Sequence, residues 1–308
     1  MKRDFLAIHD FTSKEVKEVF QLASRIKALS KKEQNPQILK NKHAALLFRK
    51  PSLRTRASFE LSVQQFGGTT IFFSDSEIGM GKRESVSDVA KVLERFYHLI
   101  IIRTFDHKEI VDFAQACSVP VINALTDLEH PCQILGDIFT AFEHKGRWEN
   151  LTIAYVGDGG NNIANSFVNA ASRLSLDLRI GTTGSRIPDK SILENARIAK
   201  LSEVKITSNP IEAVKDADII YTDVWASMGE KDKIAEREQM LRPFQINNQL
   251  LEHAKSDCIV MHCLPAERGK EITDEVIDGP HSVVFDEAEN RLHIQKAIIA
   301  YLFGAKTF

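Results

Sequence analysis

The sequence predicts an α/β fold of two doubly wound domains, each built on a parallel sheet. Short apolar runs alternate with segments of helical periodicity along the whole chain, which favours strands joined by crossover helices. The length of 308 residues is enough for two ordinary hydrophobic cores. A polar stretch with a glycine, residues 144–147, interrupts the series near its middle. We therefore expect a first domain of residues 1–145, which the C-terminal helix 287–308 rejoins, and a second domain of residues 146–286.

The first domain is predicted to open with a helix. Thr12 and Glu15 form a capping-box pattern, and the helix runs to about Ser30. The later elements are, in order, strand 44–48, a helix begun at Ser52, helix 86–96, strand 99–102, strand 119–122 and a helix with Pro131 in its first turn.

The second domain repeats the alternation of strands and helices. Its predicted strands are 151–156, 178–180, 204–206, 219–222, 258–262 and 283–285. The segment 287–303 is helical in pattern and could return to the first domain.

The composition excludes several classes of protein. Charged residues make up 27% of the chain and the net charge is −2, so no global basic field would attract nucleic acid. The apolar run 99–102 is far too short to span a membrane, and the N-terminus lacks the apolar core of a signal peptide. Four cysteines without paired spacing indicate reduced thiols in a cytoplasmic protein. We expect no zinc site, because His262 and Cys263 are adjacent and should point to opposite faces of a strand.

The segment 52–56, Ser-Leu-Arg-Thr-Arg, has the pattern of an anion-binding helix start. Ser52 stands at the N-cap position, and Phe59, Val63 and Phe66 follow at helical spacing. The first turn of a helix presents unpaired backbone N–H groups at the positive end of the helix dipole. Hydroxyls and a guanidinium in the same turn would suit a phosphate. The alternative is a capped surface helix with two solvated arginines.

The turn 157–162, Gly-Asp-Gly-Gly-Asn-Asn, raises the possibility of a dinucleotide site. The full fingerprint needs a third glycine and an acid at the end of the second strand. Here the third position is Asn162, and Thr182 and Thr183 end the second strand. We therefore expect the glycines only to permit a tight strand-to-helix turn, with the amide of Asn162 at the edge of the sheet.

Three further clusters lie just beyond predicted strand ends, where doubly wound sheets bind their ligands. They are the segments 130–133 (His-Pro-Cys-Gln), 223–229 (Asp-Val-Trp-Ala-Ser-Met-Gly) and 261–266 (Met-His-Cys-Leu-Pro-Ala). Taken one at a time, each has a structural explanation: a turn histidine, a core tryptophan and a packed thiol.

Together these segments give the chain a family resemblance. It resembles the aspartate/ornithine carbamoyltransferases, and within them the ornithine branch. The carbamoyl-phosphate motif of that family is similar to residues 52–56, with Leu53 in place of the first threonine, and its His-Pro-x-Gln motif matches residues 130–133. The ornithine branch is indicated by Asp-x-x-x-Ser-Met-Gly at 223–229 and His-Cys-Leu-Pro at 262–265, and residues 286–293 match the segment before the last helix.

The resemblance implies two α/β domains, catalytic trimers with active sites at subunit interfaces, and no metal or organic cofactor. It also implies the binding residues. Carbamoyl phosphate would be bound by Ser52, Leu53 (through its backbone), Arg54, Thr55, Arg103, His130, Gln133, Cys263, Leu264 and Arg291. Ornithine would be bound by Asn162, Asp223, Ser227 and Met228.

The implied reaction explains these residue types. A neutral δ-amine would attack the carbonyl carbon, and phosphate would leave with growing negative charge, to which preorganised donors can contribute several kcal/mol. Arg54, Arg103 and His130 would serve this role as catalytic residues. Because the free amine is protonated near neutral pH, a nearby acceptor is needed, and the pair Cys263 and Asp223 is expected to supply it, with the accepting atom left open.

Besides Leu53, one more position departs from the family pattern, and several alternative functions remain. Gly79 stands where many ornithine enzymes carry a glutamine that reaches the neighbouring subunit's substrate, and Lys82 is a possible replacement. Putrescine or N-acetylornithine would be related acceptors, and an aspartate enzyme or an α/β oxidoreductase are the other readings. An aspartate enzyme would need basic groups for a second carboxylate, and the segment 223–229 argues against it. The direction of flux in arginine metabolism is left open.

Overall fold

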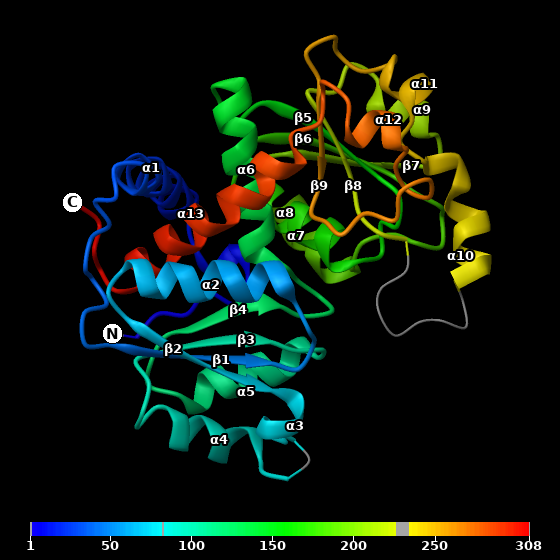
Figure 1. The fold of residues 1–308 in the computed structure, drawn as a ribbon. Coiled ribbons are helices and arrows are strands. Elements are labelled where there is room, and N and C mark those ends of the chain that lie inside the picture. The colour runs from blue at the N-terminus through cyan, green and yellow to red at the C-terminus, as the bar shows by residue number, and fades with distance from the viewer. Residues whose placement is uncertain (1, 82, 226–233, 308) are drawn as a thin grey trace. The chain divides into compact units, whose positions relative to one another are not determined.

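The computed structural model describes residues 2–81, 83–225 and 234–307. The chain divides into two compact units, one of Met1–Gly136 with Glu289–Phe308 and the other of Asp137–Ala288. Each unit has its own parallel sheet with helices around it, which confirms the predicted fold class. Two helices, α6 (Pro131–Lys145) and α13 (Val284–Leu302), begin in one unit and end in the other (Figure 1).

Unit 1 (residues 1–136 and 289–308) is built on a four-stranded sheet in the order β2-β1-β3-β4. Its strands are β1 (His43–Phe48), β2 (Thr69–Ser74), β3 (Leu99–Arg103) and β4 (Val121–Leu125). Its other elements are η1 (Ile8–Asp10), α1 (Ser13–Ser30), α2 (Leu53–Gln65), α3 (Asp75–Ile78), α4 (Val86–Leu93) and α5 (His107–Ala116). Every residue of β3 is buried, so its sequence reads as an unbroken apolar run up to Arg103.

Strand β2 was not predicted, and its position explains why. It lies at the edge of the sheet and pairs only with β1, and Ile71 on it is 51% exposed. None of its residues is fully buried, and an edge strand that is only partly covered carries only a weak alternation of apolar and polar residues. The predicted helix 86–96 is too long at its C-terminal end. Helix α4 ends at Leu93, and Phe96 is 63% exposed instead of lying on the buried helix face.

Unit 2 (residues 137–288) is built on a five-stranded parallel sheet in the order β7-β6-β5-β8-β9. Its strands are β5 (Leu151–Val156), β6 (Leu176–Gly181), β7 (Glu203–Thr207), β8 (Ile219–Thr222) and β9 (Ile259–His262). Its other elements are α7 (Asn162–Ala171), α8 (Lys190–Ala199), α9 (Pro210–Val214), α10 (Ile234–Leu241), η3 (Arg242–Phe244), α11 (Asn248–Leu251) and α12 (Asp274–Ile277). The strand order reverses between β5 and β8, which is the switch point where such sheets bind ligands.

The predicted strand 283–285 is wrong. Val283 donates its N–H to the carbonyl of Val260 at 3.0 Å, but the pairing is limited to an isolated bridge between Val260 and Ser282. The helix α13 begins at the next residue, Val284. Asp286 and Glu287 lie in its first turn, where carboxylates interact favourably with the helix dipole.

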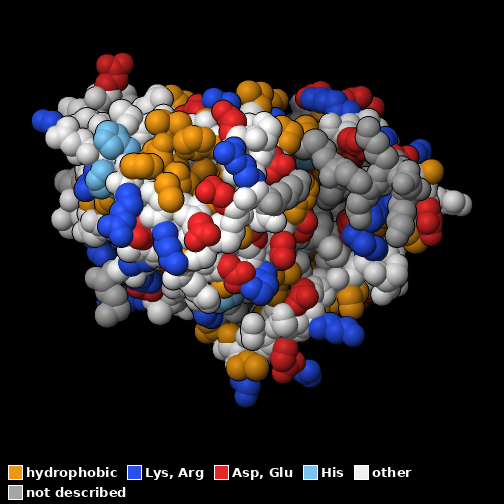
Figure 2. Space-filling model, turned by 90° about the horizontal axis from the view of Figure 1, so that it is seen from below, with side chains coloured by type: hydrophobic (Ala, Val, Ile, Leu, Met, Phe, Trp, Pro, Cys, Tyr) orange, Lys and Arg blue, Asp and Glu red, His pale blue; other side chains and the backbone are white. Residues whose placement is uncertain are grey.

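The surface carries mixed charges. On the face shown in Figure 2, acidic and basic side chains are interspersed among the described residues. Across the described part of the chain, none of the helices has the length and apolarity needed to cross a membrane.

Candidate active site

The start of α2 forms the predicted helix cap. Ser52 has an extended backbone, and its hydroxyl accepts the N–H of Thr55 at 3.3 Å. Leu53, the first helical residue, is 81% exposed, so its side chain packs against no core. The N–H groups of this first turn have no partner within the helix. The loss of one hydroxyl at Leu53 therefore leaves the backbone donors in place.

Basic side chains from distant parts of unit 1 surround this turn and the buried His130, since Arg291 contacts Thr55 and both Arg291 and Arg103 act electrostatically on His130. Arg291 of α13 donates from Nη2 to the hydroxyl of the buried Thr55. Arg103 ends β3 and is only 9% exposed. Arg54, the second residue of α2, is half-buried. The helix dipole and these guanidinium groups are suited to hold a dianion.

His130 is an uncharged imidazole in this setting. It is buried just before α6, and its pKa lies well below the usual value. Burial is the main cause, and the charges of Arg291 and Arg103 add to it. A neutral imidazole can donate one N–H to a carbonyl oxygen without adding charge. Gln133, about one turn further on, is also buried.

Cys132, in the same motif, has a structural role. Its Sγ lies 3.4 Å from the carbonyl oxygen of Asn123, and burial raises the pKa of its thiol to about 12. The thiol is therefore protonated and packed, as expected for a buried cysteine.

In unit 2, Asp223 and Cys263 meet beyond the carboxyl ends of the neighbouring strands β8 and β9. The Sγ of Cys263 lies 3.1 Å from Oδ1 of Asp223, and the N–H of Val224 donates to the same oxygen at 2.8 Å. Burial raises the pKa of both groups, and the charge of Asp223 raises that of the Cys263 thiol further. The thiol therefore keeps its proton and donates it to the carboxylate.

The turn after Cys263 is held by a buried histidine that is hydrogen-bonded through both ring nitrogens. The N–H of Leu264 donates to Nδ1 of His262 at 2.9 Å, so the proton of a neutral imidazole resides on Nε2, 3.1 Å from Glu271. Leu264 has φ 56°, in the left-handed region that only a few per cent of non-glycine residues adopt. The His262–Glu271 pair therefore fixes the backbone of Leu264.

The side chains of His262 and Cys263 do not lie on opposite faces as expected. Their donor atoms and a carboxylate oxygen of Asp223 all lie within 4.8 Å of one another. Strand β9 ends at His262, so the alternation of a strand does not extend to Cys263. Both imidazole nitrogens are nevertheless committed to Leu264 and Glu271. A metal ion would have to displace one of these bonds.

The glycine-rich turn after β5 is filled by a side chain of the protein. Asp158 accepts two hydrogen bonds from Arg186, at 2.7 and 2.6 Å. A Cβ at Gly159 would come within 2.6 Å of the carbonyl oxygen of Arg186, and one at Gly160 would meet its guanidinium at 3.4 Å. The glycines thus make room for Arg186, where a dinucleotide fold would place a pyrophosphate.

Asn161 is a residue of this site that the sequence did not indicate. It is the N-cap of α7, and its Nδ2 lies 3.3 Å from Oδ2 of Asp223. The predicted Asn162 is the first residue of the same helix. Ser227 and Met228 lie outside the described residues, as does Lys82. Gly79 caps α3 with φ 57°, a conformation that favours glycine and leaves no side chain to reach a substrate.

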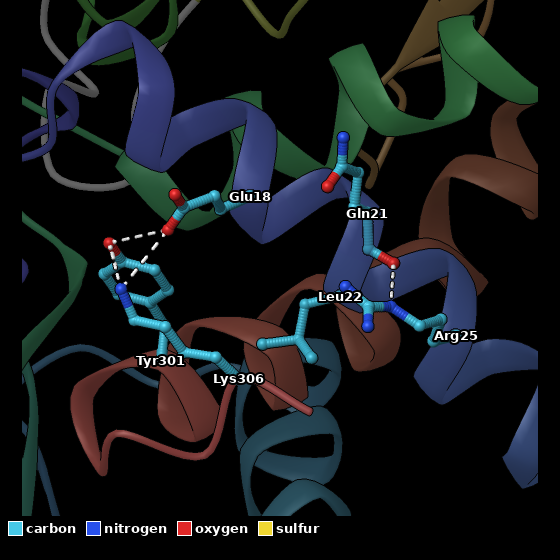
Figure 3. A pocket seen from close by; sticks show the side chains of 6 residues that line it. All are labelled: Glu18, Gln21, Leu22, Arg25, Tyr301 and Lys306. Atoms are coloured by element: carbon cyan, nitrogen blue, oxygen red, sulfur yellow. Dashed lines mark hydrogen bonds and ion pairs between the residues drawn. The ribbon is translucent and has the colours of Figure 1, made fainter. Parts of the chain in front are cut away.

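A pocket of about 260 Å³ in unit 1 holds none of the predicted site residues (Figure 3). It is lined by Glu18, Gln21, Leu22, Arg25, Tyr301 and Lys306. The carboxylate of Glu18 already accepts from Tyr301 at 3.2 Å and from Lys306 at 3.3 Å. Because it contains none of the predicted site residues, we do not count it as part of the active site.

The two halves of the chain match the two domain models of one family. Residues 3–143 match the carbamoyl-P binding domain of aspartate/ornithine carbamoyltransferase, and residues 149–302 match its Asp/Orn binding domain. The chain belongs to this carbamoyltransferase family. The resemblance stated from the motifs is thereby confirmed.

Relatives in this family are similar over nearly the whole chain. An ornithine carbamoyltransferase of Syntrophus aciditrophicus is 48% identical over 302 residues, covering 98% of this chain and 100% of the relative. The structure of ornithine carbamoyltransferase from Pyrococcus furiosus has a TM-score of 0.94 at 42% identity, covering 98% of this chain and 97% of that one. The anabolic enzyme from Campylobacter jejuni has a TM-score of 0.92 at 33% identity, covering 97% and 98%.

The Cys263–Asp223 hydrogen bond predicts how the thiol reacts. Removing the charge with Asp223→Asn should lower the pKa of Cys263, so alkylation by iodoacetamide at pH 8 should become faster. Cys117, Cys132 and Cys258 are buried with raised pKa values and should stay slow. Peptide mapping of the alkylated protein identifies the site, with Cys263→Ser as control. An unchanged rate at Cys263 would show that Asp223 does not control its proton.

Proposed function

We propose that the protein transfers the carbamoyl group of carbamoyl phosphate to the δ-amine of L-ornithine, giving L-citrulline and phosphate. The observation that carries this proposal is the buried carboxylate of Asp223, hydrogen-bonded to Cys263 beside the switch point of unit 2. A buried carboxylate is suited to an ammonium group of the acceptor, and relatives named ornithine carbamoyltransferase match over nearly the full chain. We assign carbamoyl phosphate to the domain of residues 1–145 with 287–308, and ornithine to residues 146–286.

Carbamoyl phosphate is bound by the cluster at α2. The N–H groups of the first turn, the hydroxyls of Ser52 and Thr55, and the guanidiniums of Arg54 and Arg103 hold the phosphate. Neutral His130 donates an N–H to the carbonyl oxygen. The other carbamoyl contacts are assigned to Gln133, Arg291, Cys263 and Leu264. Donors aimed at the oxyanion of the tetrahedral intermediate lower the barrier, since removing one typically costs about 2.7–4 kcal/mol.

Ornithine is bound beside Asp223. The carboxylate pairs with the α-ammonium group, and Asn162, Ser227 and Met228 address the rest of the amino-acid head. The lone pair of the uncharged δ-nitrogen attacks the carbonyl carbon. The bond from that carbon to the phosphate oxygen then breaks, the nitrogen gives its proton to the departing phosphate, and hydrogen phosphate leaves. Because the Cys263 thiol already carries a proton, the free protein offers no thiolate to accept this one.

The choice of acceptor tests the proposal. Initial rates of carbamoyl transfer should be highest with ornithine when putrescine, N-acetylornithine and aspartate are compared under the same conditions. Putrescine lacks the α-carboxylate, N-acetylornithine has no α-ammonium to pair with Asp223, and aspartate carries a second carboxylate. Faster transfer to any of these three would assign the protein to a different acceptor.

The charges of the site predict ordered binding, with carbamoyl phosphate first. At neutral pH ornithine is a cation, and the amine must reach a carbonyl group surrounded by guanidiniums. Bound carbamoyl phosphate, a dianion, neutralises the guanidinium groups and removes their repulsion of the cationic ornithine. Calorimetry should therefore show ornithine binding to the complex with a carbamoyl-phosphate analogue and much weaker binding to the free protein. Tight ornithine binding that the analogue leaves unchanged would contradict this order.

We also propose that three copies of the chain assemble and that the protein works in the cytoplasm, in arginine biosynthesis. The biosynthetic role is supported by relatives named anabolic ornithine carbamoyltransferase in Pyrococcus furiosus and Campylobacter jejuni. Four free cysteines suit a reducing compartment. Light scattering at working concentration tests the assembly.

A further inference from the structure

The side chain of Asn161 performs two separate tasks. Its Oδ1 accepts the N–H of Ala164 at 2.9 Å and so caps α7. Its Nδ2 donates to the hydroxyl of Tyr155 at 2.9 Å and to Oδ2 of Asp223 at 3.3 Å. The cap is a structural function that many residues can supply. The donation to Asp223 is a different function, which depends on the amide nitrogen.

Tyr155 determines which way the amide of Asn161 faces. This tyrosine is fully buried on β5, and its hydroxyl donates to the carbonyl oxygen of Asp158 at 3.0 Å. Because the hydroxyl donates its only proton to that carbonyl, it can only accept a hydrogen bond from Asn161. The nitrogen of the amide must then face Tyr155 and Asp223, and the oxygen must face Ala164.

The carboxylate of Asp223 is thereby held on both oxygens. Oδ1 accepts from the N–H of Val224 and the thiol of Cys263, and Oδ2 accepts from Asn161. Burial opposes the charged form of Asp223, whereas hydrogen bonds to its oxygens favour that form. Among the described residues, the titratable groups that act electrostatically on Asp223 or are acted on by it include Tyr155, Tyr221, His262, Cys263 and Glu271.

We propose that Asn161 and Tyr155 are positioning residues for the reaction, which orient the Asp223 carboxylate and keep it ionised for the amino-acid substrate. This inference rests on the proposed function. In it, Asn161 touches neither substrate and acts through Asp223. The chain from the carbonyl of Asp158 through Tyr155 and Asn161 to Asp223 links the turn after β5 to the end of β8, on the two sides of the switch point.

The variant Asn161→Asp separates the two tasks. Aspartate is as good an N-cap as asparagine, so the helix cap is kept. The amide donor is lost, and a second carboxylate is placed beside Oδ2 of Asp223. Two carboxylates that share a site cannot both ionise easily, so the pKa of the pair rises. A matched control is Asn247→Asp, because Asn247 is also half-buried and caps α11 with a single bond to Leu250 N–H at 3.0 Å.

The first test is kinetic. For Asn161→Asp, kcat/KM for ornithine should fall roughly 10- to 150-fold, as expected for losing a hydrogen bond to a charged group. The acid limb of its pH profile should move to higher pH, while carbamoyl-phosphate binding and the melting temperature stay as in Asn247→Asp. Tyr155→Phe should give a smaller fall in the same parameter.

The second test does not need activity. Placing another carboxylate near Asp223 should move the pH dependence of Cys263 alkylation upward in Asn161→Asp and leave it unchanged in Asn247→Asp. Normal ornithine kinetics and an unchanged thiol profile in Asn161→Asp would overturn the inference, and so would a loss of stability with an unchanged pH profile. Absence of citrulline formation by the wild-type protein would instead defeat the proposed function, and the thiol profile would still decide the positioning of Asp223.

Discussion

Replacing Arg54 by alanine should lower citrulline formation by about 10²–10³-fold with little loss of stability, because its guanidinium is assigned to the phosphate and not to the core. Arg54 is the second residue of α2, in the turn capped by Ser52. Charge-assisted bonds from such a group to a phosphate strengthen as the leaving group gains charge. Steady-state kinetics with carbamoyl phosphate as the varied substrate, together with thermal unfolding, measure both effects.

Arg56→Ala is the matched control for this prediction. Arg56 lies two residues further along the same helix, but its side chain pairs with Glu60 at 2.9 Å and lies 3.7 Å from the ring centroid of Phe72. We expect its loss to leave turnover nearly unchanged, since exposed ion pairs contribute little. Near-normal turnover of Arg54→Ala, or equal losses in both variants, would contradict the assignment of residues 52–55 as the phosphate site.

The second large effect is expected for Asp223→Asn, which keeps the shape of the side chain and removes its charge. Truncating one partner of a desolvated charge pair typically costs about 2–5 kcal/mol. The KM for ornithine should therefore rise strongly, while the dissociation constant of carbamoyl phosphate changes little. The preference for ornithine over N-acetylornithine should also narrow, because the α-nitrogen of the latter is uncharged.

A control for this variant is available at the other end of the same strand. Asp216 lies before β8, is exposed, and has φ 53°, which asparagine also tolerates. Asp216→Asn should leave both substrates unaffected. If Asp223→Asn retains the wild-type KM for ornithine and the wild-type preference, Asp223 is a structural turn residue and ornithine binds elsewhere.

Strong local signals in the sequence were enough to predict most of the fold. Strands β5 and β8 have the predicted bounds, 151–156 and 219–222, because both are buried and read as apolar runs. The cap at Ser52 follows from residue types in one turn. Strand β2 was missed because an edge strand with exposed side chains lacks such a pattern. Residues 283–285 are as apolar as a strand, yet α13 begins at Val284.

Contacts within the site depend on tertiary structure and could not be predicted in the same way. The pairing of Cys263 with Asp223 joins the ends of two strands that are neighbours only in the folded sheet. Asn161 could not be preferred over Asn162 as a partner of Asp223, since the two differ only in which one caps α7. Arg186 fills the glycine-rich turn from another loop. No local pattern around Gly159 indicates that partner.

Carbamoyl transfer to the δ-nitrogen of ornithine is tested most directly by isotope labelling. Carbamoyl phosphate labelled with ¹³C at the carbonyl and ornithine labelled with ¹⁵N at the δ-position are incubated with the protein and followed by NMR. The proposed reaction predicts a one-bond ¹³C–¹⁵N coupling in the product and one phosphate released per coupled carbon. Phosphate release without that coupling would contradict the proposed reaction. A ¹³C-carbamoyl group attached to the α-nitrogen would contradict it as well.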